Sequence, residues 1–191
     1  MSRPRGLRVI AGENRGRRLV SPLGNDVRPT KDIVREAMFS ALDSRHVLVD
    51  ANVLDLFAGS GALAIEALSR GARRAVLVDR DRAALSAIRA NVDVLSLQGT
   101  TRVVAQDVRQ FLGGSPPAEA PFDLVFADPP YDTSDEIVTE ILTALTAPGW
   151  LAPDALVSVE RPVRHPVTPP NGWSSGWERA FGDTLLTFCT G

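Results

Sequence analysis

The stretch Val53-Leu54-Asp55-Leu56-Phe57-Ala58-Gly59-Ser60-Gly61 decides the fold class of this chain. Its first four residues form a short apolar run, which is typical of a buried strand. The glycines at 59 and 61 then allow a tight turn, and the sequence up to Arg70 predicts a helix that ends at Gly71. A strand that passes through a glycine turn into a helix opens the sheets that bind nucleotides.

The same alternation continues along the chain. After the opening strand we expect further strands at 75–78, 102–105, 122–128 and 155–160, helices at 82–94 and 135–145, and a short helix through Phe111. A hairpin formed by 177–181 and 184–189 is expected to close the chain. Strands that alternate with helices predict an α/β fold with a doubly wound, mostly parallel sheet.

The front of the chain has a different pattern. Residues 7–20 predict a β-hairpin around a polar turn at 12–16. Thr30 is expected to cap a helix whose buried face carries Ile33, Val34, Ala37, Met38, Ala41 and Leu42. We therefore divide the chain into a basic hairpin-and-helix extension, residues 1–44, and a main domain, residues 45–191.

Charge is distributed unevenly along the 191 residues, whose net charge is −2. Residues 1–31 carry a net charge of +6, whereas the remaining 160 residues carry −8. A basic arm on an acidic body predicts contact with a polyanion, although a solubilising tail would have the same composition. The candidate polyanion-binding residues, for which the resemblance described below implies RNA, are Arg3, Arg5, Arg8, Arg15, Arg17, Arg18, Arg28 and Lys31.

Several classes of protein are disfavoured. No stretch approaches the roughly 20 apolar residues of a membrane span, and the basic N-terminus has no apolar run behind it, so we do not expect a secretory signal. The single Cys189 precludes an internal disulfide, and the two histidines, His46 and His165, have no metal-ligand spacing. We therefore expect a cytoplasmic protein without a metal.

The glycine turn alone does not identify a cofactor, because dinucleotide-binding folds use similar turns. Asp55 would repel a pyrophosphate but attract the ammonium group of a methionine moiety, or else tie down the turn as a cap. Asp79, at the end of the next strand, is placed to accept from ribose hydroxyls. The candidate cofactor-binding residues are Asp55, Phe57, Ala58, Gly59, Ser60, Gly61, Asp79, Arg80, Asp107 and Val108.

Two further aspartates have competing interpretations. Asp107 follows the third strand of the main domain, where it would accept from the 6-amino group of an adenine or cap the helix that begins at 108. For Asp81 the helix-cap interpretation is favoured.

The tetrapeptide Asp128-Pro129-Pro130-Tyr131 follows the apolar strand 122–127. A carboxylate and carbonyls fixed by prolines accept from a planar amino group, while the Tyr131 ring stacks on a flat heterocycle. We interpret all four residues as catalytic for chemistry on the exocyclic amine of a nucleobase. The alternative is a rigid turn after a strand.

With these motifs in this order, the chain resembles class I S-adenosylmethionine-dependent methyltransferases. The blocks Arg8–Leu19 and Arg28–Phe39 resemble the RsmD family, whose members methylate the N2 of one guanine in 16S rRNA. This resemblance covers residues 8–160. It implies a Rossmann-like seven-stranded sheet with one antiparallel strand, S-adenosylhomocysteine as the second product, and an assembling small ribosomal subunit as the substrate. We further expect a monomer.

Other functions remain open on the residues alone. DNA adenine-N6 and protein-glutamine methyltransferases also place an acid or amide before Pro-Pro-aromatic, although 191 residues leave little room for a separate DNA-recognition domain. A nicotinamide-dependent oxidoreductase would leave the tetrapeptide unexplained. A non-catalytic ribosome-assembly factor would bind RNA through the arm without transferring a methyl group.

Overall fold

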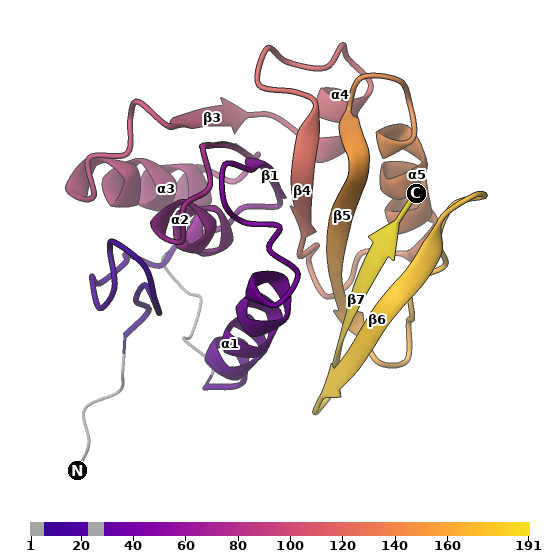
Figure 1. Cartoon of the computed structure of the whole chain (residues 1–191), viewed down its shortest axis with the longest axis horizontal. Coiled ribbons are helices and arrows are strands. Elements are labelled where there is room, and N and C mark those ends of the chain that lie inside the picture. Colours follow the sequence, from indigo (N-terminus) through magenta and orange to yellow (C-terminus); the bar gives the residue numbers. More distant parts are fainter. Residues whose placement is uncertain (1–5, 23–28) are drawn as a thin grey trace.

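Helices and strands alternate along most of the chain (Figure 1). The structure is a computed structural model that describes residues 6–22 and 29–191, with the backbone alone at 29–31. The elements are α1 (Pro29–Asp43), β1 (Asn52–Leu56), α2 (Ala62–Ser69), β2 (Arg74–Asp79), α3 (Arg82–Val94), β3 (Thr101–Ala105), α4 (Val108–Leu112), β4 (Phe122–Ala127), α5 (Asp135–Leu145), β5 (Leu151–Pro162), β6 (Ser174–Phe181) and β7 (Thr184–Thr190).

The strands form one seven-stranded sheet in the order β3-β2-β1-β4-β5-β7-β6. Strands β1 to β5 pair in parallel, and β7 runs antiparallel to both β5 and β6. The predicted α/β fold with one antiparallel strand is confirmed. Because β1 lies between β2 and β4, Leu56 at its end is in register with Val78 on one side and Ala127 on the other. The carboxyl ends of these three strands therefore share one edge, where α/β sheets bind ligands.

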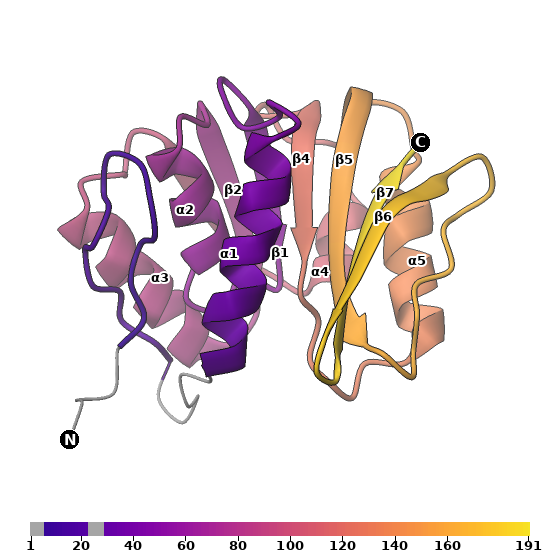
Figure 2. The same ribbon diagram turned by 60° about the horizontal axis from the view of Figure 1, so that its bottom comes forward.

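Each face of the sheet is covered by its own group of helices (Figure 2). On one face, α1, α2 and α3 pack over a core that includes Phe39 and Phe126, whose ring centroids are 5.7 Å apart. On the other, α4 and α5 pack over a core that includes Phe111 and Trp150. Figure 2 also shows that α1 begins at the end of the molecule toward which β4 and β5 point. The first residues of α1 thus lie near the carboxyl edge of the sheet.

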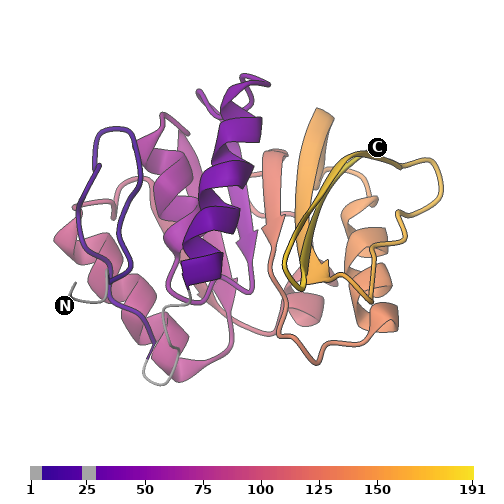
Figure 3. The ribbon, with the colours of Figure 1, turned by 90° about the horizontal axis from the view of Figure 1, so that it is seen from below.

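The arm formed by residues 6–22 lies beside α2 and α3, on the opposite side of α1 from β4 and β5 (Figure 3). Its two sides meet at a single antiparallel bridge, Arg8 to Arg18, so the predicted hairpin path is present without regular strands. Val9 and Leu19 are buried against Ile65 of α2 and Leu95 at the end of α3. The arm is therefore packed onto the main domain by its apolar side chains.

Helix α1 differs from the prediction in its start and in its buried face. It begins at Pro29, so Thr30 is in the first turn and not the cap; proline is well suited to the first helical position because it lacks an N–H. Ile33 is 57% exposed, whereas Arg35 and Phe39 are buried. The buried face is thus rotated relative to the apolar stripe, because it also receives the arm, whose Arg8 carbonyl accepts from Arg35 Nη2 at 2.9 Å.

Strands β5 and β6 begin earlier than expected. In β5 the pairing with β4 shifts between Phe122 and Leu124, and Asp154 has a φ of +61°. The bulge exposes Pro153 and Asp154, which in the sequence indicate a turn. The early residues of β6, which start at Ser174, are polar and exposed, so they carry no apolar alternation.

Candidate active site

Three aspartates meet at the carboxyl edge of β2, β1 and β4. Asp55 lies in β1, Asp79 ends β2, and Asp128 directly follows β4. The pKa of Asp55 is raised to about 8, chiefly by burial and also by the charges of Asp128 and Asp79, while a hydrogen bond from the Ala64 amide acts in the opposite direction. Such a group of acids favours a bound cation, because a positive charge here would offset both the cost of a buried carboxylate at Asp55 and the repulsion among the three aspartates.

The loop between β1 and α2 is held in an unusual backbone conformation. Phe57, Gly59 and Gly61 all have positive φ, at 61°, 59° and 76°. Such a conformation is strained for phenylalanine, and strain of this kind gathers at functional sites. A Cβ at Gly61 would lie 2.9 Å from Leu77 Cδ2, whereas a Cβ at Gly59 would have nothing nearer than 3.9 Å. The loop is therefore close-packed beneath Gly61 and open above Gly59, as a ligand-binding turn requires.

Carboxylates bind this loop from both sides. Asp79 Oδ2 accepts from Gly59 N at 2.8 Å, and Asp55 Oδ2 accepts from Ala64 N at 3.1 Å. The interpretation of Asp55 as a tie on the glycine turn therefore agrees with the geometry, and its carboxyl group also interacts electrostatically with Asp79 and Asp128. Each oxygen retains lone pairs for a ligand.

Asn91 of α3 is a residue that the sequence did not single out. It is fully buried, its Oδ1 accepts from Val20 N at 2.7 Å, and its Nδ2 donates to Val20 O and to Ser60 O at 2.9 Å each. This one side chain links the arm to the glycine loop. A lone asparagine within the apolar face of a helix was the only sequence signal.

The aspartates after β2 and β3 act as helix caps. Asp81 accepts from Ala84 N at 2.9 Å, which confirms its predicted role. Asp107 caps α4 through the amide of residue 109, and its Oδ2 accepts from Arg80 Nη1 at 2.9 Å. The cap interpretation of Asp107 is thus present in the structure, and an adenine contact would use its remaining lone pairs. Val108 is buried at the start of α4.

The tetrapeptide leaves the sheet beside β1. Asp128 is half-buried, Pro129 is buried, and Pro130 is exposed. Tyr131 is 59% exposed, which is unusual for a large aromatic side chain. The electrostatic effect of Asp128 on Asp55 places the tetrapeptide's carboxylate close to the glycine-loop site. The Tyr131 ring therefore lies at the surface next to this acid.

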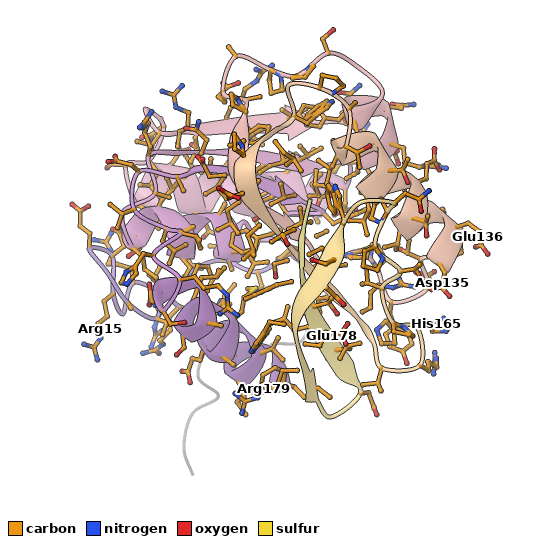
Figure 4. All side chains as sticks on the ribbon, turned by 45° about the vertical axis from the view of Figure 1, so that its right-hand side comes forward. Arg15, Asp135, Glu136, His165, Glu178 and Arg179 are labelled. Carbon is orange, nitrogen blue, oxygen red and sulfur yellow. The ribbon has the colours of Figure 1, made fainter. Side chains whose placement is uncertain are left out.

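A second group of residues, also missed by the sequence, holds the loop that follows the tetrapeptide. Arg161, which is 3% exposed, donates from Nη1 to Thr133 O at 2.8 Å and from Nη2 to Asp135 Oδ1 at 2.6 Å. His165 Nδ1 lies 3.1 Å from Asp135 Oδ2, and Figure 4 shows the two side chains together. Hydrogen bonds from His165 and Arg161 lower the pKa of Asp135. A charged residue at the end of an apolar strand was the available signal for Arg161, but its partners lie 26 and 28 residues away.

The structure describes only some of the candidate RNA-binding residues. Arg15, Arg17 and Arg18 are exposed on the arm, and Arg8 is half-buried. Arg15 projects from the side of the molecule far from Asp135 (Figure 4). Three further candidates, Arg3, Arg5 and Arg28, lie outside the described residues. The side chain of Lys31 also lies outside them.

Metal sites and membrane spans are both absent from residues 6–22 and 29–191. No group of three or more histidine, cysteine, aspartate or glutamate side chains in these ranges has the arrangement of a metal site. None of the helices in the same ranges combines the length and the apolar character needed to cross a bilayer.

Comparison with known proteins identifies the family. The model of the family described as "Conserved hypothetical protein 95" matches residues 7–190. The chain is 41% identical over 177 residues to ribosomal RNA small subunit methyltransferase D of Escherichia coli K12, covering 92% of this chain and 85% of that protein. This chain belongs to the RsmD family. The resemblance in the sequence is confirmed, and the matched region extends past residue 160, where it was expected to end.

Further similarities agree with the family and the fold. The protein of the same name from Haemophilus influenzae is 33% identical, over 92% of this chain and 89% of its own length. The solved structure of yhhF from Escherichia coli superimposes with a TM-score of 0.83 at 40% identity, over 96% of this chain and 97% of the other. The RsmD-family chain is thus a methyltransferase with a Rossmann-like fold, and its methyl donor is S-adenosylmethionine.

Proposed function

We propose that this RsmD-family chain methylates the exocyclic N2 amine of one guanine in 16S rRNA. The observation that supports this most strongly is the placement of Asp128-Pro129-Pro130-Tyr131 at the strand edge that also holds Asp55 and the glycine loop. An amine acceptor and a stacking ring thereby lie beside a site that suits a cationic cofactor. The relatives named for small-subunit ribosomal RNA supply the substrate class.

The residues at the edge fit S-adenosylmethionine. When bound, this cofactor supplies an electrophilic methyl group. Asp55 is suited to the cationic methionine end, because it is a buried acid beside Asp79 and Asp128, and its pKa is raised to about 8 by burial and by these neighbours. Asp79 is suited to the ribose hydroxyls, Asp107 to the adenine amino group, and the open face above Gly59 to the close approach of the ligand. The contacts of Phe57, Ala58, Ser60, Gly61, Arg80 and Val108 with the cofactor belong to the same proposal.

The chemistry requires an amine whose lone pair is free. In guanine the 2-amino lone pair is delocalised into the ring, so the nitrogen is a poor nucleophile. Hydrogen bonds from its two N–H groups to the Asp128 carboxylate and the Pro129 carbonyl would favour a more tetrahedral nitrogen. Most of the acceleration then comes from positioning and from fixed charges. Once the new N–C bond forms, the amine is strongly acidic and loses its proton without a strong base.

The rest of the surface would present the RNA. Tyr131 stacks on a base that has left its helix or loop, which costs a few kcal/mol. The arm in the extension, residues 1–44, contacts phosphates and fixes the register, while the domain of residues 45–191 carries the chemistry. We place the enzyme in the cytoplasm as a monomer acting on an assembling small subunit.

One experiment tests the proposal directly. The protein is incubated with labelled S-adenosylmethionine and small ribosomal subunits that lack the modification, and the labelled nucleoside is then mapped. We expect one N2-methylguanosine in 16S rRNA. Label in adenine or in protein would favour the other amine methyltransferases, and tight RNA binding without label would indicate a non-catalytic assembly factor.

A further inference from the structure

The end of β5 and the residues that follow it lie against the loop 128–135, which carries the tetrapeptide and is called the catalytic loop. The end of β5 reaches beyond β4, since Val159 is in register with Ala127, the last residue of that strand. The residues after 159 therefore run beside the loop 128–135. This segment, residues 161–165, contributed nothing to the interpretation of the sequence.

The segment is anchored by a buried guanidinium. Arg161 binds the Thr133 carbonyl and the Asp135 carboxylate, and His165 reaches the other oxygen of that carboxylate. Arg161 is 3% exposed, and its charge-assisted hydrogen bonds to Thr133 and to the exposed Asp135 carboxylate hold both stretches of chain together. Arg161 is thus a positioning residue for the loop.

Between these anchors, Arg164 lies over the ring of Tyr131. Its guanidinium carbon is 5.0 Å from the ring centroid, and both side chains are exposed. A guanidinium is planar and weakly hydrated, so it stacks on aromatic rings, and nucleobases stack on it in turn. Arg164 therefore rests on the one ring that the proposed function assigns to the target base.

We propose that Arg164 is a substrate-contacting residue whose guanidinium plane closes over the target base and sandwiches it against Tyr131. Without RNA the guanidinium covers the ring. Two stacked layers need roughly 7 Å, twice the ~3.4 Å spacing of stacked bases, so Arg164 retreats by about 2 Å as the base enters. The exposed side chain is free to make this movement, while the anchor at Arg161 keeps its backbone in place.

This inference rests on the proposed base methylation. It assigns the effect of Arg164 to the flat shape of its guanidinium group and not to its positive charge alone, and two substitutions distinguish these contributions. Arg164→Ala removes both, whereas Arg164→Lys keeps the charge and loses the plane. A matched control exists in the same chain: Arg179 lies 5.0 Å over the ring of Phe181 on the β6–β7 hairpin, well apart from Asp135 in Figure 4.

The first test measures steady-state methyl transfer to unmodified small subunits. We expect Arg164→Ala to raise the KM for subunits about tenfold, on the scale of base–aromatic stacking, with the KM for S-adenosylmethionine unchanged. Arg164→Lys should be equally impaired, and Arg164→Ala should add little to Tyr131→Ala, because both residues contact the same base. Arg179→Ala should match the parent. Full rescue by lysine, or a parental KM in Arg164→Ala, would overturn the proposal.

A second readout does not depend on methyl transfer. Tyr131 is the sole tyrosine of the chain, so 3-fluorotyrosine places one fluorine at this ring. A guanosine-containing single-stranded oligoribonucleotide should shift its resonance, with an affinity about tenfold weaker in Arg164→Ala. No response in the parent would contradict the sandwich. An Arg164-dependent response in a protein that transfers no methyl group would refute the proposed function and leave the sandwich standing.

Discussion

The glycine loop and the catalytic loop occupy the same edge of the sheet but are held in different ways. The glycine loop is fixed from within by buried groups, chiefly Asp55, Asn91 and the close packing at Gly61. The catalytic loop is exposed at Tyr131 and is held from outside by Arg161 at the end of β5. The comparison indicates a preformed cofactor site beside an acceptor site that adapts to its substrate.

The largest expected effect that separates the two regions is the loss of turnover on substitution of Asp128. We expect Asp128→Ala to lower kcat by roughly 100- to 1000-fold, the scale of losing one preorganised polar interaction in the transition state. The affinity for S-adenosylmethionine, measured by calorimetry, should stay within about twofold, because the glycine loop does not depend on this side chain. Asp132→Ala, an exposed change in the same loop, is the control. Turnover of Asp128→Ala within a few-fold of the parent would remove Asp128 from the reaction.

The buried Asp55 of the glycine-loop site is tested by the pH dependence of the free energy of unfolding. The folded chain retains the Asp55 proton up to about pH 8, whereas the unfolded chain loses it near the ordinary pKa of 3.8. Between these values the folded state binds more protons, so its stability falls as pH rises. Urea unfolding should show this fall in the parent and in Asp132→Asn but not in Asp55→Asn. Equal pH slopes in all three proteins would show that Asp55 ionises normally.

Asn91 sharpens the comparison, because it connects the glycine loop to the arm. Asn91→Ala leaves the Val20 and Ser60 backbone groups without this partner, and a buried polar group left unpaired costs about 1–3 kcal/mol. We expect a loss of stability of that size in urea, together with weaker binding of S-adenosylmethionine. Exposed Asn171→Ala serves as the control. Unchanged cofactor affinity at reduced stability would confine Asn91 to a purely structural role.

The smallest effects are expected at the exposed arginines of the arm. Removing residues 1–20 would also remove buried Val9 and Leu19, so point substitutions are cleaner. Arg15→Ala with Arg18→Ala should weaken RNA binding several-fold and reduce the salt dependence of log K by about one for every phosphate that the arm no longer neutralises. Filter binding at several salt concentrations measures the slope. A parental slope would mean that the arm's charge serves solubility.

The sequence predicted best what depends on neighbouring residues. The strand, glycine turn and helix around Gly59 and Gly61 were predicted almost to their bounds, because local backbone requirements determine them. The bulge at Asp154 and the buried face of α1 were missed, since each depends on packing between distant segments. The roles of Arg161 and Arg164 were missed for the same reason: a cation at the end of a strand or in a loop acquires a role only when the fold brings Asp135 or Tyr131 to it.

The central claim is that the carboxylate of Asp128 faces the cofactor across the edge shared by β1 and β4. A crystal structure of this chain with S-adenosylhomocysteine tests it most directly. We predict a ligand seated on the glycine loop, with its amino group toward Asp55 and its sulfur facing Asp128. A ligand bound elsewhere, or an Asp128 side chain turned away from the sulfur, would contradict the account.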